Sequence, residues 1–340
     1  MARAVPVTGR ILGVLQGPSG ESLVAVAPAT GGGSATSRNR ILVLSSQGRV
    51  RHSYNTPYAT GAMALRADSL YWAGLTGANY TVWRTWIGRI DLKTNRSVNR
   101  EWRGVAAGVG MIATADKRGG PVWFGASEIG GSYGLPYLVA YLPRSGRFAP
   151  LGVPSSIGGG VGDVVVAPTG VVYGEIPEAS EVFAYDPTSH KFPLTVSVPN
   201  IPAGSLRAMQ IAPTGTIWAV ASWSRHVAFV SLAPNHWKPV VTLLPAIYAS
   251  ASGLTWQRGV WTVATKRDGS TGLLRLEITP HGPSWHFEPF AHAPLSGNFA
   301  LIPGAAGSMW AAQLDGPGLW HVELPASFHS SARRTVTPKR

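Results

Sequence analysis

The chain has 340 residues with no cysteine, 41 glycines, 27 prolines and 13 tryptophans, and its 29 lysines and arginines against 16 acidic residues give a formal net charge of +13. The 45% hydrophobic content excludes a disordered chain, and the lack of any uninterrupted apolar run near 18 residues excludes a membrane-spanning helix. Without cysteine, disulfides, thiol catalysis and cysteine-ligated zinc are excluded as well.

Taken in chain order, the apolar segments are typical of short strands between turns. The first unit has such segments at residues 11–15, 23–27 and 41–44. β-Branched and aromatic runs bounded by Gly, Pro, Asn and Asp favour strands and hairpins. A later unit shows the pattern in full, with expected strands at residues 163–167, 171–173, 181–185 and 192–198. No segment has a sustained 3.6-residue apolar period, so we expect almost no helix.

A short phrase recurs along the chain: a turn with Gly or Asp, an apolar residue and then an aromatic one. The aromatic steps are 51, 50, 45, 43 and 49 residues, and a degenerate seventh copy at residues 20–24 lies 48 residues before the first aromatic. Four strands at this period are typical of a β-propeller blade. We therefore predict an all-β fold, a single propeller of seven four-stranded blades, with six blades as the alternative. The aromatic positions are Trp72, Trp123, Tyr173, Trp218, Trp261 and Trp310.

The boundaries follow from the repeats. Residues 1–329 are predicted to form the propeller, and residues 330–340, which lack an apolar pattern, a flexible basic tail. A strand near Ala4 to Val7 is expected to pair into the last blade, which would close the ring and remove an exposed edge. The aromatic residue of each second strand is expected to pack between blades.

The repeats resemble those of the virginiamycin B lyase-like and NHL-type propellers. The phrases that carry the likeness are IAPTGTIW at residues 211–218 and IGRID at residues 87–91. The resemblance implies a propeller over most of the chain. Lyase-like blades commonly read Trp-Phe-Thr-Glu, which places a carboxylate near the central channel. The phrases that begin at Trp72, Trp123, Trp218 and Trp261 lack that Glu, which argues against a metal-assisted lyase.

Three residues are candidates for catalysis at the mouth of the channel: Asp163, Glu175 and Arg207. Asp163 and Arg207 open neighbouring blades, so their side chains could face each other across the channel. A structural ion pair is the favoured interpretation. The alternative is a lyase or hydrolase that uses these three residues, with a divalent metal ion as its only cofactor. Otherwise we predict neither a cofactor nor a metal site.

Three long polar loops follow second strands, at residues 29–39, 75–84 and 126–135. Rigid aromatic side chains among Gly, Ser, Thr and Asn suit the recognition of planar or sugar-like ligands. The competing interpretation, given equal weight, is that these aromatics only hold their own loops in place. The ligand-binding candidates on this loop side are Tyr80, Trp83, Glu128, Tyr133, Trp223 and Asn298.

Two motif matches are set aside. Residues 130–134 read G-x-S-x-G, but a strand-like segment follows where a nucleophile elbow needs a helix. His286 with Glu288, and His321 with Glu323, each place two ligand-type side chains on one face of an outer strand. A metal site requires three or four convergent ligands.

The excess of basic over acidic residues indicates which kinds of partner the protein could bind. Basic residues are dispersed along the sequence, and the acidic ones are scarce, which suits an exterior protein in an acidic medium. The expected partner is a glycan, an anionic surface polymer or another protein. Nucleic acid is disfavoured but stays open, because Trp83, Trp86 and Trp102 lie among arginines.

The leading hypothesis is an extracytoplasmic or secreted propeller that binds a glycan or anionic polymer on its loop side. A cytoplasmic location is the alternative, since no clean apolar stretch follows the first residues. The functional alternatives are the channel-mouth enzyme and a structural platform in a surface assembly. The shortage of carboxylates argues against an enzyme.

Overall fold

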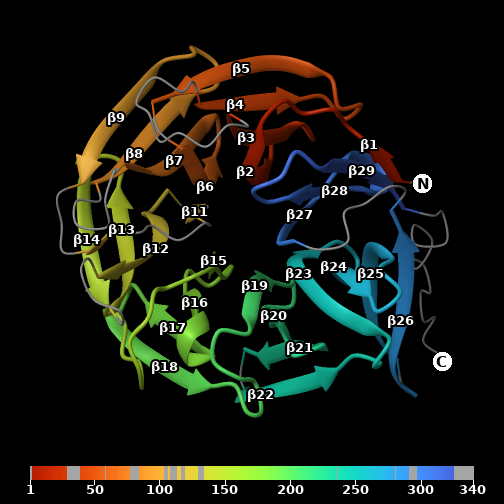
Figure 1. Cartoon of the computed structure of the whole chain (residues 1–340). Coiled ribbons are helices and arrows are strands. Elements are labelled where there is room, and N and C mark those ends of the chain that lie inside the picture. The colour runs from red at the N-terminus through yellow and green to blue at the C-terminus, as the bar shows by residue number, and fades with distance from the viewer. Residues whose placement is uncertain are drawn as a thin grey trace, which may run out of the picture.

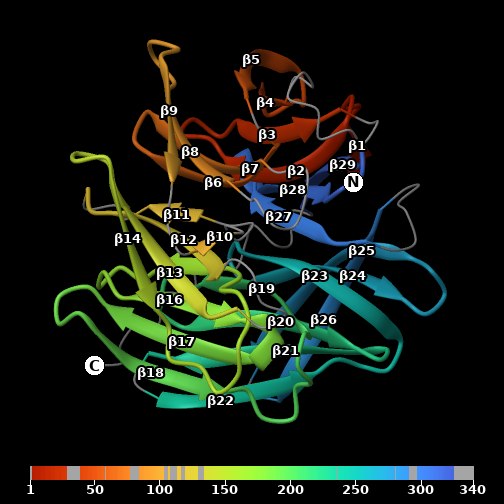
Figure 2. The ribbon, with the colours of Figure 1, turned by 60° about the vertical axis from the view of Figure 1, so that its left-hand side comes forward.

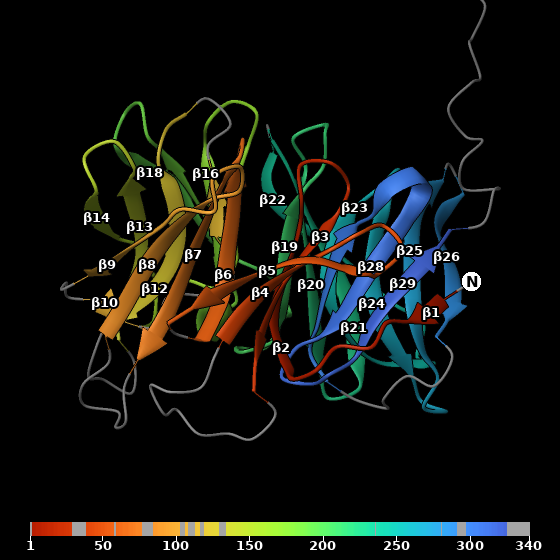
Figure 3. The ribbon, with the colours of Figure 1, turned by 90° about the horizontal axis from the view of Figure 1, so that it is seen from above.

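Seven antiparallel sheets form a ring around a central axis in this computed structural model (Figure 1). Figure 3 turns the ring edge-on and shows the strands of each sheet crossing its thickness. The seven-bladed β-propeller predicted from the repeats is therefore confirmed. The structure describes residues 2–28, 39–57, 59–76, 84–102, 106–107, 113–115, 119–128, 134–234, 236–279, 281–290 and 297–324.

In blades 1–6, the strands follow one another outward from the axis in chain order. Blades 1 and 2 consist of β2 (Arg10–Gln16), β3 (Ser22–Ala27), β4 (Asn39–Leu44), β5 (Val50–Thr56), β6 (Ala59–Arg66), β7 (Ser69–Thr76), β8 (Arg84–Asp91) and β9 (Ser97–Trp102). In blade 3 two short strands, β10 (Ala106–Ala107) and β11 (Ala113–Ala115), share the inner position and pair with β12 (Val122–Glu128), which β13 (Pro136–Leu142) and β14 (Arg147–Gly152) follow.

The remaining blades repeat the arrangement. Blades 4 and 5 consist of β15 (Val164–Val166), β16 (Val172–Ile176), β17 (Glu181–Asp186), β18 (Lys191–Ser197), β19 (Leu206–Ile211), β20 (Ile217–Trp223), β21 (His226–Ala233) and β22 (His236–Leu243). Blades 6 and 7 consist of β23 (Tyr248–Trp256), β24 (Val260–Lys266), β25 (Thr271–Thr279), β26 (Gly282–Pro289), β27 (Phe299–Pro303), β28 (Ser308–Gln313), β29 (Leu319–Glu323) and β1 (Ala2–Ala4).

The ring is closed by its N-terminus. β1 pairs antiparallel with β29 and becomes the outer strand of blade 7, as expected, although the strand lies at Ala2–Ala4 rather than near Ala4 to Val7. The Val5 amide still donates to the carbonyl of Leu319 at 2.8 Å, one residue beyond the paired strand. The chain then crosses from the rim to the axis to begin β2.

The core lies in wedges between neighbouring blades. Adjacent residues of a second strand face opposite neighbours, as alternation along a strand requires. Val122 packs in the cluster shared with blade 2, and Trp123 packs in the cluster shared with blade 4. In blade 2, Leu70 and Tyr71 hold these two positions, so Trp72 is one residue out of register with the repeat and faces blade 1. The prediction that the aromatics pack between blades is confirmed, but the aromatic equivalent to Trp123 is Tyr71.

Helical structure in the described residues is limited to two single turns, η1 (Pro177–Ala179) and η2 (Ala305–Gly307). None of the helical segments in this part of the chain has the length and apolarity needed to cross a bilayer.

Candidate functional site

Two carboxylates lie side by side at the axial end of blade 4. Asp163 directly precedes β15, and Glu175 lies near the end of β16. The Glu175 amide donates to the Asp163 carbonyl at 3.2 Å, which continues the β15–β16 ladder by one pair. Cross-strand partners carry their side chains on the same face of a sheet. Both are buried, with 7% of Asp163 and 2% of Glu175 exposed.

The hydrogen bonds of the two carboxylates differ. Asp163 Oδ2 accepts the backbone amide of Met209 in blade 5 at 3.0 Å. Ser252 makes the same kind of link further round the ring, where its hydroxyl accepts the Phe299 amide of the next blade at 2.9 Å. Asp163 therefore joins two blades near the axis. Glu175 Oε2, by contrast, is buried without a hydrogen-bond partner in the described part of the chain.

Burial changes the protonation of both groups. Burial raises the pKa of Asp163 to about 7, even though the Met209 amide favours its charged form. Burial, and then the charge of Asp163, hold the pKa of Glu175 well above its usual range, and the Arg207 guanidinium opposes this shift. A carboxylic acid that keeps its proton near neutral pH can serve as a general acid, so the predicted catalytic roles of these two residues stay predictions.

The expected ion pair between Asp163 and Arg207 is wrong. Arg207 lies in β19 with its side chain exposed, and no ion pair joins it to either carboxylate in the residues that the structure describes. The physical reason is that Asp163 turns across the blade interface to the backbone of β19 and is buried there. Arg207 is still near enough for its positive charge to lower the pKa of Glu175. It stays a candidate for holding an anionic group at the channel mouth.

Two further carboxylates lie beyond Glu175 on the same blade. Glu178 accepts the Gly160 amide at 3.3 Å, and the buried Glu181 accepts the Ser155 hydroxyl at 2.7 Å and the Ser156 amide at 3.2 Å. The blade thus gathers four acidic residues at one end. Even so, no group of three His, Asp or Glu side chains within the described ranges could hold a metal ion.

The predicted ligand-binding residues are not brought into one site by the described part of the structure. Trp223 ends β20, stacks on His226 at a ring distance of 5.7 Å, and packs against the cluster between blades 4 and 5. The exposed Asn298 precedes β27 in blade 7, where its carbonyl accepts the Leu314 amide at 2.8 Å. Tyr80, Trp83 and Tyr133 lie outside the described residues, as do residues 325–340 and the side chain of Glu128.

Sequence reasoning missed a basic surface on blades 1–3. Residues 1–152 hold 17 of the 29 lysines and arginines but only six of the 16 acidic residues. Six exposed arginines at the outer strands, here called the basic arc, form no hydrogen bond or ion pair through their side chains in the described structure. β5, β9 and β14, which carry or adjoin them, follow one another along the rim (Figures 1 and 2). The arc consists of Arg49, Arg51, Arg96, Arg100, Arg144 and Arg147.

The basic arc had a sequence signal. Arg49, Arg96 and Arg147 each lie five residues after the end of a third strand, and they are 47 and 51 residues apart, close to the blade period. The arginines therefore occupy matching places in three successive blades. By contrast, Trp102 is 7% exposed in the cluster between blades 2 and 3, and Trp86 packs against the cluster between blades 1 and 2. These two tryptophans are thus not presented for stacking on bases.

Comparison with solved structures shows which proteins share this fold. Neither a known protein family nor a curated protein matches the sequence. A catalytically inactive variant of virginiamycin B lyase from Staphylococcus aureus, with quinupristin, has a TM-score of 0.67 at 13% identity, covering 96% of this chain and 99% of that one. The chain shares its fold with virginiamycin B lyase. The predicted resemblance is confirmed at the level of the fold.

Other propellers are similar to the same extent. Hydrazine synthase from Kuenenia stuttgartiensis has a TM-score of 0.69 at 9% identity, covering 94% of this chain and 97% of that one. The extracellular domain of a hybrid two component system from B. thetaiotaomicron has a TM-score of 0.62 at 10% identity, covering 95% of this chain and 42% of that one. Neighbours with such different names share only the architecture, so function has to be argued from the site.

Proposed function

We propose that this protein is an extracytoplasmic binding protein whose basic arc holds an acidic polysaccharide at the rim of blades 1–3. The observation that carries the proposal is the row of exposed, unpaired guanidinium groups at matching places in three successive blades. A polyanion with regularly spaced charges could contact all three blades at once. Arginine suits this role because its planar donors match carboxylate or sulfate groups in two-point hydrogen bonds.

Asp91 and Asp68, two acidic residues near this surface, form no ion pair with the basic arc in the described part of the chain. Asp91 accepts the amides of Lys93 and Thr94 in its own turn, at 3.0 and 2.8 Å. Asp68 binds the Lys93 ammonium group at 2.7 Å. An acidic polysaccharide is favoured over nucleic acid because Trp102 is buried between blades 2 and 3 and Trp86 packs, partly buried, between blades 1 and 2, so that neither ring stands free to stack on bases.

The exterior location is supported by the few carboxylates of the chain and by extracellular domains among the structural neighbours. An acidic medium would leave a surface of this composition strongly positive, and so would strengthen its attraction to a sulfated or carboxylated polymer that stays ionised.

Binding to polygalacturonate, measured by biosensor at several salt concentrations, tests the proposal. Replacing Arg49, Arg51, Arg96 and Arg100 with Gln should weaken binding on the order of 100-fold at low salt, at about 0.2–1 kcal/mol for each exposed charge pair. The salt dependence of the affinity should also become shallower.

The matched control removes four positive charges from blades 4–6, at Lys191, Arg225, Lys238 and Arg267, all exposed. This control variant should keep affinity within a few-fold of the wild-type protein. Equal losses in both variants would mean that only net charge matters. Tighter binding to single-stranded DNA than to polygalacturonate would replace the polysaccharide with nucleic acid.

A further inference from the structure

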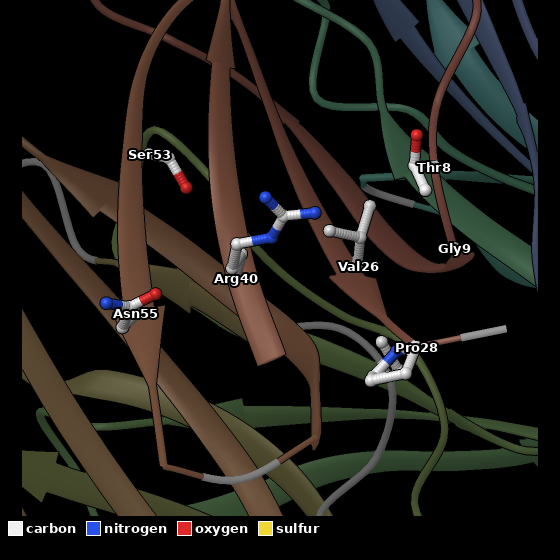
Figure 4. A pocket seen from close by; sticks show the side chains of 8 residues that line it. Thr8, Gly9, Val26, Pro28, Arg40, Ser53 and Asn55 are labelled. Atoms are coloured by element: carbon white, nitrogen blue, oxygen red, sulfur yellow. The ribbon is translucent and has the colours of Figure 1, made fainter. Parts of the chain in front are cut away.

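The crossing of the chain from β1 to β2 creates a pocket beside blade 1. Because β1 belongs to blade 7, residues 5–9 must return past the face of blade 1 to reach the axis. Thr8 and Gly9 form one wall, and Val26, Ala27 and Pro28 at the end of β3 form the apolar floor (Figure 4). The cavity measures about 540 Å³, within the range of roughly 300–1,000 Å³ usual for ligand sites.

Polar side chains line the opposite wall. Arg40 in β4 pairs with Asn55 in β5, and Leu42 pairs with Ser53. Leu42 packs in the cluster shared with blade 7, so residues in step with it face the same way. Arg40, Ser53 and Asn55 therefore stand on the face of blade 1 that looks toward the crossing segment. Figure 4 shows the Arg40 guanidinium directed toward Val26, with Thr8 on the far side of Val26.

These polar groups are available to a ligand. The side chains of Arg40, Ser53, Asn55 and Thr8 form no hydrogen bond or ion pair with any residue in the described structure. Arg40 is half-buried, so its guanidinium is partly shielded from water and would bind an anion more strongly than a fully exposed one. The pocket offers one fork of donors for an oxyanion, and hydroxyl and amide groups for neutral hydroxyls.

The wall opposite Arg40 is held in place by a close approach. Gly9 has a φ of +118°, and a Cβ atom there would lie 2.3 Å from the carbonyl oxygen of Ala27. Only glycine lets the crossing segment come so near to the end of β3. The width of the pocket is thus set by backbone contact rather than by mobile side chains.

We propose that this pocket binds one sugar unit bearing an oxyanion, with Arg40 on the carboxylate or sulfate, Ser53 and Asn55 on the hydroxyls, and the sugar's apolar face against the partly exposed Pro28. The proposal rests on the proposed function, because it makes the pocket the specific subsite of the polymer that the basic arc holds. Arg51 links the two regions, since it lies two residues before Ser53 on β5, roughly 7 Å away.

Binding of monosaccharides, followed by ligand-observed NMR, tests the pocket separately from the polymer. Galacturonate and galactose 6-sulfate supply the two oxyanions, and galactose is the neutral control. Wild-type protein should bind at least one acidic sugar at least tenfold more tightly than galactose. Arg40→Gln should remove this preference, and Arg225→Gln, an exposed arginine of blade 5 outside both the basic arc and the pocket, should preserve it. Asn55→Ala should weaken binding several-fold, and thermal unfolding establishes that each variant is folded.

The outcomes separate the two proposals. Equal binding of galactose and the acidic sugars, or an acidic-sugar preference that survives in folded Arg40→Gln protein, would overturn the pocket. If acidic sugars bind through Arg40 while polygalacturonate binding is insensitive to the basic arc, the pocket stands and the proposed polymer site fails. If the polymer needs the arc but no acidic sugar is preferred, the polymer site stands without the pocket.

Discussion

As the pH falls from 8 to 4, the burial of Asp163 should add about 4 kcal/mol to the free energy of unfolding of the wild-type protein, and the double variant Asp163→Asn, Glu175→Gln should lack most of this increase. The folded protein holds the proton of Asp163 up to a pKa of about 7, whereas the unfolded chain releases it near the ordinary value of 3.8. The free energy of unfolding therefore falls as the pH rises from 3.8 to about 7. Glu175, whose pKa is raised as well, contributes in the same direction.

The substitutions remove the buried charges with little change of shape. An Asn side-chain oxygen at position 163 can still accept the Met209 amide, so the link between blades 4 and 5 is kept. At pH 8 the double variant should be more stable than the wild-type protein, because neither buried site has to carry a charge. Because protonation of these two buried carboxyl groups stabilises the folded state, this chain, which is poor in carboxylates, could be most stable in mild acid.

Urea denaturation at pH 4, 5, 6, 7 and 8 measures this effect. Asp186→Asn is the control, because Asp186 is only half-buried and hydrogen bonds from Ser189 and Thr188 hold the pKa of its carboxyl below the usual range. That control should leave the dependence between pH 5 and pH 8 unchanged. Wild-type stability that is flat or rises with pH over this range would contradict the burial of two charged carboxyls.

Replacing Trp310 with Ala should cost about 3–5 kcal/mol of folding free energy, as truncation of a buried Trp usually does. Trp310 is fully buried in the wedge between blades 7 and 1, beside Val5, Ile11 and Leu42. This wedge lies where the N-terminus closes the ring, so its loss weakens the junction between β1 and the first blade.

Chemical denaturation of three variants distinguishes the contribution of ring closure to stability from that of side-chain packing in general. Trp310→Phe should cost much less than Trp310→Ala, since a Phe ring keeps most of the buried apolar area. Trp223→Ala is the control, because the half-buried Trp223 lies at the end of β20 away from the closure. If Trp310→Ala lowers the free energy of unfolding no more than Trp223→Ala does, the wedge between blades 7 and 1 does not limit stability.

The architecture could be predicted because each blade repeats one local pattern. Val122 and Trp123 show why: neighbouring residues of a strand face opposite blades, so an apolar residue followed by an aromatic one recurs wherever a blade is packed on both sides. In blade 2 the repeat was aligned on the wrong aromatic residue, because Tyr71 and Trp72 are both aromatic and both buried. Only the contacts of each ring reveal which one faces the next blade.

The site was harder to predict, because the spacing of residues along the sequence does not determine where a side chain points or whether it is buried. Asp163 and Arg207 do open neighbouring blades, yet one turns into the blade interface and the other into solvent. The pocket at Arg40 depends on the return of the chain after β1, which no local pattern marks. The basic arc, by contrast, recurs at the blade period and could have been found by comparing the outer strands of successive units.

Arginine modification with phenylglyoxal, read by peptide mass spectrometry with and without saturating polygalacturonate, tests the central claim most directly. The polymer should protect Arg49, Arg51, Arg96, Arg100, Arg144 and Arg147, all exposed in the free protein, and should leave the exposed Arg225 and Arg267 as reactive as before. Protection confined to Arg225 and Arg267, or no protection of blades 1–3 while the polymer is bound, would contradict the account.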